Sequence, residues 1–123
     1  MDTCNLCSLE FLLPIGLYDA ERIQGAVTVR LGAHGEGYDS LGKGFYSVTD
    51  RLALFDAGGP FGNPTNDSRR TAIVDSTERC LMVIFGPGSY SAARMEAHVQ
   101  AADARLRAFA HTTRVETAVL GGL

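Results

Sequence analysis

The sequence predicts one domain of mixed helix and sheet, of the α/β (α+β) class, spanning residues 1–123. Two observations support this prediction. Several short segments alternate apolar and polar residues as strands do, and one longer segment repeats its apolar residues at helical spacing. The chain of 123 residues is 46% apolar and 20% charged, which suits a single modest hydrophobic core.

The first half of the chain predicts a helix followed by strands. Residues 4–13 (CNLCSLEFLL) predict a short helix that ends before Pro14, because helical geometry is disfavoured just ahead of a proline. Residues 23–31 predict a half-buried strand, because Val27, Val29 and Leu31 alternate with polar side chains. Residues 32–44 contain five glycines and predict a turn-rich connection or a hairpin, and residues 51–56 (RLALFD) predict a second strand.

The middle of the chain is irregular before it becomes apolar again. Residues 58–70 hold three glycines, two prolines and two asparagines, so they predict a long loop, and a loop of this length in a small domain is usually functional or mobile. Residues 71–74 predict a brief strand. Residues 79–85 (RCLMVIF) are continuously apolar after the first residue, which predicts a strand covered on both faces.

The last third predicts a long amphipathic helix within residues 89–111, capped at its start by Ser89 or Ser91. Residues 114–120 alternate again and predict a final strand. We expect the helix to lie across one face of a mixed sheet. The apolar stripe of this helix consists of Ala92, Met95, Val99, Ala102, Leu106 and Phe109.

Charge and hydropathy exclude some classes of protein. The chain carries 11 basic and 14 acidic residues, a net charge of −3, which argues against strong unaided binding to phosphate backbones. No apolar run approaches the roughly 18 residues that a membrane helix needs, and the start does not resemble a signal peptide. We therefore expect a soluble, cytoplasmic protein with no membrane partner.

Cysteines and histidines do not predict a metal centre. Cys4 and Cys7 have C-x-x-C spacing, but a structural zinc needs four ligands and the rest of the chain offers only Cys80 and scattered histidines. We expect the two helical thiols to face the interior, and we expect no metal and no cofactor. The three histidines, which we expect to be solvated or structural, are His34, His98 and His111.

The polar segment 63–71 (NPTNDSRRT) is the strongest candidate site in the residues themselves. It gathers amides, hydroxyls, one carboxylate and two guanidinium groups beside glycines that allow close backbone approach. Such a set can orient a polar substrate or activate a water molecule. The alternative is a solvated connection built from Asx turns, and the sequence leaves both interpretations open.

A family resemblance adds to these predictions. Residues 5–25 (NLCSLEFLLPIGLYDAERIQG) resemble the opening of the B3/B4 domain of the phenylalanyl-tRNA synthetase beta subunit, through Asn5, Glu10, Pro14 and the Tyr18-Asp19 pair. Residues 74–83 are similar to the family's acid-x-Thr segment before a buried strand. The combination of LLPIGLYD with DSRRT is more similar still to standalone B3/B4-like proteins. The resemblance covers most of residues 5–85 and implies packed sheets with flanking helices in a single B3/B4-like domain.

The resemblance also implies an activity and shows departures from it. The family's pocket hydrolyses a wrongly attached aminoacyl ester from tRNA, using polar side chains to place the substrate and a water molecule. Its pocket histidine would fall at Gly16, its threonine at Cys4, and its glutamate near Arg69, which leaves Asp67 as the nearest acid. We therefore expect a pocket in the same place without the original hydrolytic site. A start at Met1 would also omit residues that normally precede the first helix.

Two main hypotheses follow. The first is a protein similar to a trans-editing hydrolase, acting on an aminoacyl ester of tRNA or a small analogue. In it the catalytic residues are Asp67, as the general base or the group that orients the water, and Arg69; Arg69 or Arg70 binds a carboxylate or phosphate. The second is a B3/B4 scaffold recruited to bind or rearrange a specialised metabolite without tRNA. A third is a module completed by a partner or by a second copy, as a homodimer. The residues expected to bind substrate are Cys4, Gly16, Asn63, Thr65, Asn66, Ser68 and Arg70.

Overall fold

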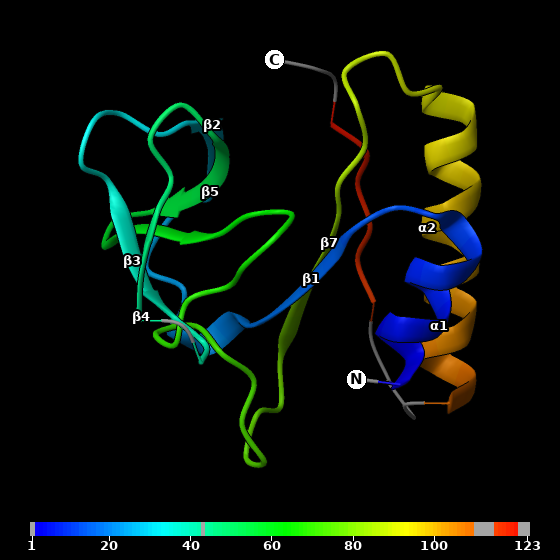
Figure 1. The fold of residues 1–123 in the computed structure, drawn as a ribbon. Coiled ribbons are helices and arrows are strands. Elements are labelled where there is room, and N and C mark those ends of the chain that lie inside the picture. The colour runs from blue at the N-terminus through cyan, green and yellow to red at the C-terminus, as the bar shows by residue number, and fades with distance from the viewer. Residues whose placement is uncertain (1, 43, 110–114, 121–123) are drawn as a thin grey trace. The chain divides into compact units, whose positions relative to one another are not determined.

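A computed structural model describes residues 2–42, 44–109 and 115–120. The chain forms two compact units, which we describe separately (Figure 1). The helical unit comprises residues 1–15 and 84–123, and the sheet unit comprises residues 16–83. The fold is mixed helix and sheet, as the sequence predicts.

The helical unit is built from α1 (Asp2–Phe11) and α2 (Ala92–Phe109), which pack against each other. Both predicted helices are confirmed. Helix α1 ends where Leu12 adopts a left-handed conformation with φ of 57°, two residues before the proline. Helix α2 begins after Ser91, whose hydroxyl accepts a hydrogen bond from the Arg94 backbone N–H at 3.2 Å. Ser91 is therefore the N-cap that satisfies one of the free N–H groups of the first turn.

Sulfur, charge and aromatic contacts join the two helices. Cys7 is fully buried and accepts a hydrogen bond from Arg105 Nη1 at 3.5 Å. The same guanidinium forms an ion pair with Glu10 and lies 5.7 Å from the centroid of the Phe11 ring. The Phe11 ring also stacks on His98, with 4.3 Å between the ring centroids. These contacts give both Cys7 and His98 structural positions, as the sequence predicts.

The sheet unit contains a 3-10 helix, Ala20–Arg22, and small antiparallel sheets. A three-stranded sheet has the order β2-β5-β6, and β3 and β4 form the hairpin predicted in the glycine-rich segment. Strands β1 and β7 also pair, with Pro14 and Phe85 bonded at one end and Ala20 and Arg79 at the other. The strands are β1 (Ile15–Asp19), β2 (Thr28–Leu31), β3 (Gly37–Ser40), β4 (Gly44–Ser47), β5 (Leu52–Asp56), β6 (Gly59–Gly62) and β7 (Cys80–Ile84).

Aromatic residues dominate the core of the sheet unit. Tyr18 and Phe61 are fully buried, and their rings meet edge to face with 5.1 Å between centroids. A second cluster lies under the hairpin and contains Tyr38, Val48 and Phe55. Edge-to-face packing of this kind adds to the stabilisation that burial alone provides.

Several predicted elements need correction. The segment 58–70 is not one continuous loop, because its first residues form β6. This strand lies at the edge of its sheet, where a proline such as Pro60 is tolerated although it has no backbone N–H to donate. Residues 71–74 and the described residues 115–120 form no strand. Strand β7 is half-buried rather than covered on both faces, and β1 is its only partner among the described strands. Strand β1 was not predicted, since its five residues lie between a proline and a turn.

Among the described residues, neither α1 nor α2 has the length and hydropathy of a membrane-spanning helix.

Of the predicted stripe on α2, Ala102 is buried and Met95, Val99 and Leu106 are half-buried, whereas Ala92 is exposed. The stripe therefore faces the interior along the middle of the helix. The placement of this helix across a sheet stays a prediction.

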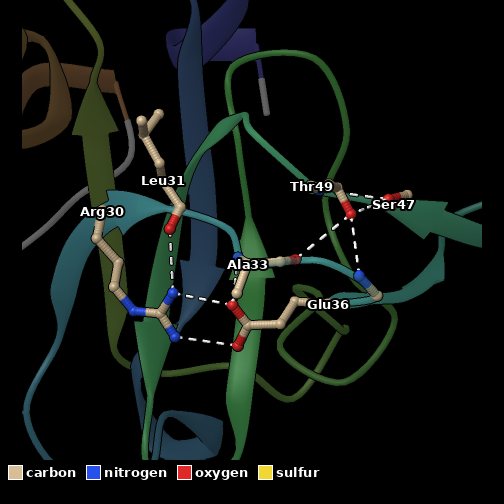
Figure 2. A network of polar contacts seen from close by, with 7 residues as sticks. Arg30, Leu31, Ala33, Glu36, Ser47 and Thr49 are labelled. Atoms are coloured by element: carbon tan, nitrogen blue, oxygen red, sulfur yellow. Dashed lines mark hydrogen bonds and ion pairs between the residues drawn. The ribbon is translucent and has the colours of Figure 1, made fainter.

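A polar network closes the turn between β2 and β3 (Figure 2). The Glu36 carboxylate accepts hydrogen bonds from Arg30 Nη1 and Nη2 at 2.9 and 3.0 Å and from the Ala33 backbone N–H at 2.6 Å. The Arg30 guanidinium also lies 3.6 Å from the centroid of the Phe55 ring. The bonds from Arg30 and then from Ala33 lower the pKa of Glu36 from 4.5 to about 2. The ionised carboxylate is thus the form that the turn stabilises.

We expect Glu36→Gln to lower the melting temperature modestly at pH 7. Because folding lowers the pKa of Glu36, its contribution to stability is complete above pH 4.5 and is lost as the pH falls towards 2. The melting temperatures of wild type and variant should therefore converge as the pH falls. Calorimetry between pH 7 and pH 3 measures this, and a difference that stays constant with pH would contradict the prediction.

Candidate functional site

The candidate site is the loop of residues 63–68, which joins the end of β6 to the edge of β3. Isolated bridges pair Gly62 with Asp67 and Ser40 with Ser68. Further backbone hydrogen bonds run from the Ser68 N–H to the Phe61 carbonyl at 2.9 Å and from the Leu41 N–H to the Asp67 carbonyl at 3.1 Å. The loop is therefore fixed at its end by the strands on both sides, which suits a site that must hold side chains in place.

Asn63 organises the loop from within. Its side chain is buried, and Oδ1 accepts hydrogen bonds from the Thr65 and Asn66 backbone N–H groups, both at 2.8 Å. This is the Asx turn that the sequence left open as one interpretation. Since Oδ1 takes both backbone donors, Nδ2 is directed away from the turn and donates to the Tyr46 hydroxyl at 3.2 Å. The loop is thus not simply a solvated connection.

Two further tyrosines bind the loop from neighbouring strands. The Tyr18 hydroxyl, from β1, donates a hydrogen bond to Asp67 Oδ1 at 2.7 Å. The Tyr38 hydroxyl, from β3, donates to the Asn66 backbone carbonyl at 2.6 Å. Buried phenols of this kind need a hydrogen-bond partner, and here each partner belongs to the candidate site.

A hydrogen bond holds only one of the two carboxylate oxygens of Asp67 among the described residues. Its side chain is half-buried, and among the described residues no donor lies within hydrogen-bond distance of Oδ2. Burial raises the pKa of Asp67, and the hydrogen bond from Tyr18 offsets part of this effect. An acid with a raised pKa and one unoccupied oxygen suits general-base chemistry.

Two glycines leave room for the Tyr18 ring. Gly16 and Gly62 both lie against the fully buried phenol. A methyl group added at Gly16 would lie 2.7 Å from Tyr18 Cζ, and one added at Gly62 would lie 2.6 Å from Tyr18 Cε1. The phenol therefore occupies the volume that a side chain at position 16 would need. Gly16 is near the candidate site because it is next to Tyr18, and it brings no side chain of its own.

The two arginines of the loop differ in their surroundings. Arg70 binds the buried Asp56 carboxylate through two hydrogen bonds of 3.0 and 2.9 Å. Burial would raise the pKa of Asp56, but the bonds from Arg70 and from two backbone N–H groups outweigh it and lower that pKa. Arg69 is exposed and forms a looser pair with Asp39, at 3.4 Å. Arg69 is thus the more accessible guanidinium.

The remaining predicted residues are divided between the two units. Ser68 is buried, and its hydroxyl forms a hydrogen bond with that of Thr71 at 3.1 Å, while Thr65 is exposed. Cys4 belongs to α1 in the helical unit, where it is buried and donates to the Ile15 carbonyl at 3.9 Å. Within the part of the chain that the structure describes, no group of three His, Cys, Asp or Glu side chains could hold a metal ion.

Sequence reasoning missed the role of the tyrosines. Tyr18 entered only as part of a resemblance, and Tyr38 and Tyr46 were not singled out at all. The pairing of Tyr38 with Tyr46 across β3 and β4 depends on the hairpin register, which alternation alone does not set. The one usable signal was Asn63, whose Asx turn leaves an amide donor in need of a partner.

Comparison with known protein families identifies the family of this chain. The family model of the B3/4 domain matches residues 1–118. The chain belongs to the B3/4 domain family. No curated protein matches it. The resemblance read from the sequence is therefore correct for the family, and the match covers more of the chain than the residues 5–85 that carried it.

In this B3/4 domain we expect Tyr18→Phe to raise the pKa of Asp67 further. The hydroxyl stabilises the charged carboxylate, and its loss leaves both oxygens without a donor among the described residues. Loss of a hydrogen bond to a charged group should also reduce the free energy of unfolding by about 1.5–3 kcal/mol. Nuclear magnetic resonance titration of Asp67 and urea denaturation measure the two effects.

Tyr90→Phe is the matched control for this experiment. The Tyr90 hydroxyl bonds to His98 in the helical unit, at 2.6 Å, so its removal should leave the pKa of Asp67 unchanged. An Asp67 pKa that is the same in Tyr18→Phe as in wild type would contradict the prediction.

We expect Arg70→Met to destabilise the B3/4 domain by about 2–3 kcal/mol, because it leaves the buried Asp56 carboxylate without its charged partner. Arg69→Met removes an exposed pair and should cost about 1 kcal/mol or less. Urea denaturation of both variants gives the comparison. An equal decrease in the free energy of unfolding in the two variants would show that the Arg70–Asp56 pair stabilises the domain no more than the exposed pair does.

Proposed function

We propose that this B3/4 domain is an aminoacyl-pocket protein that hydrolyses an aminoacyl ester, carried by the end of a tRNA or by a small analogue. The observation that carries the proposal is the state of Asp67: Tyr18 fixes one carboxylate oxygen, and the other has no donor among the described residues. Membership in the B3/4 domain family supports a pocket for an aminoacyl group.

The chemistry assigned to Asp67 is general-base catalysis. Its available oxygen takes a proton from a water molecule while the water oxygen bonds to the ester carbonyl carbon. The bond from that carbon to the alcohol oxygen then breaks, and the departing oxygen takes up a proton to leave as the alcohol. The raised pKa of Asp67 makes it a stronger base than an exposed carboxylate. Asn66 and Thr65 offer polar groups beside it, and the accessible Arg69 is suited to a substrate carboxylate or phosphate.

Charge supports a second candidate, a scaffold that binds or rearranges a specialised metabolite without tRNA. The chain has 11 basic and 14 acidic residues. Near the loop, Arg70 is bound to Asp56 and Arg51 to the Tyr46 hydroxyl. Few positive charges are thus left for a polynucleotide, and a small ligand would suit this balance better.

We expect Asp67→Asn to abolish ester hydrolysis while the melting temperature stays nearly unchanged. The amide keeps an oxygen that can accept the Tyr18 hydrogen bond, but it cannot take a proton from water. Release of the free amino acid from an aminoacyl-tRNA and from an amino acid methyl ester is the measurement. Asp75→Asn, at an exposed position outside the loop, is the matched control.

The same assays separate the two candidates. Hydrolysis of both substrates by the wild type supports the editing-like activity, and full activity in Asp67→Asn would refute the role of this residue. Hydrolysis of the small ester alone would favour a substrate other than tRNA. No release from either substrate would refute ester hydrolysis and favour the binding scaffold.

A further inference from the structure

Tyr46 has an unusual set of partners for a tyrosine. It lies on β4, is half-buried, and receives hydrogen bonds from Arg51 Nη1 at 2.8 Å and from Asn63 Nδ2 at 3.2 Å. The Arg51 guanidinium also lies 5.4 Å from the centroid of the Tyr46 ring. Two donors are therefore directed at the phenol oxygen, and the Asn66 side chain is a third hydrogen-bonding partner.

These donors determine where the phenolic proton can point. Arginine has no acceptor, and the orientation of the Asn63 amide is fixed because Oδ1 takes the Thr65 and Asn66 backbone N–H groups. The Tyr46 oxygen must then be the acceptor in both contacts. Its own proton is therefore directed away from Arg51 and Asn63, on the side of the Asn66 side chain, the third hydrogen-bonding partner of the hydroxyl. A bound molecule that accepts this proton would take the place of Asn66 in that contact.

The electrostatic surroundings make this proton easier to release. Burial alone would raise the pKa of Tyr46, but hydrogen bonds from Asn63, Arg51 and Asn66 and the charge of Arg51 outweigh burial and lower it. Tyr38, directly opposite on β3, shows the contrary effect. Burial raises its pKa, and the charges of Asp67 and Tyr46 raise it further. Of the two neighbouring phenols, Tyr46 is the stronger acid.

Tyr46 also lies beside the loop that carries Asp67. Its hydroxyl binds Asn63 of that loop, and its ring lies 5.7 Å from the ring of Tyr38, centroid to centroid. Tyr38 in turn binds the residue before Asp67, through the Asn66 carbonyl. The acid and the base thus share one neighbourhood of the sheet unit.

We propose that Tyr46 is the general acid of the hydrolysis and donates its hydroxyl proton to the departing alcohol oxygen. This inference rests on the proposed function. Asp67 takes the proton of the attacking water, the bond between the carbonyl carbon and the alkoxide breaks, and the alkoxide takes the Tyr46 proton. Asn63 and Arg51 act as positioning residues that stabilise the resulting phenolate. Solvent then carries the proton from Asp67 back to Tyr46, so that no other reactant is consumed.

The leaving group tests this role. We expect Tyr46→Phe to slow hydrolysis of an amino acid methyl ester by about 100-fold or more, because methoxide needs a proton as it leaves. Hydrolysis of the p-nitrophenyl ester of the same amino acid should be nearly unaffected, because p-nitrophenolate leaves without one. Tyr38→Phe, which disturbs the loop without removing the acid, should slow both esters alike. Equal slowing of both esters by Tyr46→Phe, or of neither, would overturn the proposal.

A second variant tests the role of Tyr46 without removing its hydroxyl, in case Tyr46→Phe fails to fold. Arg51 is exposed, and its side chain contacts the Tyr46 phenol. Arg51→Met should raise the pKa of Tyr46 and move the alkaline limb of the pH–rate profile for the methyl ester to higher pH, and Arg51→Lys should restore much of it. Ultraviolet titration should show one tyrosine ionising below the ordinary value of about 10. That ionisation should be lost in Tyr46→Phe and shifted upward in Arg51→Met.

The outcomes distinguish this inference from the function on which it rests. If the wild type hydrolyses no ester, the proposed function fails and the general acid fails with it. If the wild type is active and Asp67→Asn is not, an unchanged methyl-ester rate in Tyr46→Phe refutes the general acid alone. An alkaline limb that does not move in Arg51→Met would also refute it.

Discussion

The hydrogen bond from the Tyr18 hydroxyl to Asp67 joins residues 49 positions apart in the sequence and ties the candidate site to the core. The phenol is fully buried, packs edge to face on Phe61, and therefore has a fixed position. Its bond directs one oxygen of Asp67, and among the described residues no donor holds the other. The orientation of the proposed base is thus determined by packing in the core rather than by the loop alone.

Paired charges and dipoles keep the rest of the loop in place. Arg70 neutralises the buried Asp56 at the end of β5, and the Asn63 amide joins the turn of the loop to Tyr46. Each of these groups would be costly to bury without its partner. Satisfying them requires one arrangement of the loop, which explains how a segment rich in asparagine, proline and glycine can present an ordered set of side chains.

Much of the fold could be predicted from the sequence, since long periodic segments such as α2 and alternating ones such as β5 carry their own signal. Short strands with few side chains to read, β1 and β6, could not. The family and the loop were also accessible, through residues 5–25 and 63–71. The tyrosines were not, because their importance arises from partners far along the chain, and because hairpin register decides that Tyr38 faces Tyr46. A long-range hydrogen bond leaves no local pattern.

The contact of Tyr18 with two glycines limits what can stand at positions 16 and 62. In this chain the phenol fills the volume that a side chain at either position would need. A larger residue introduced at one of them would displace the phenol and break the hydrogen bond that orients Asp67. The orientation of the proposed base therefore depends on two residues that have no functional group of their own.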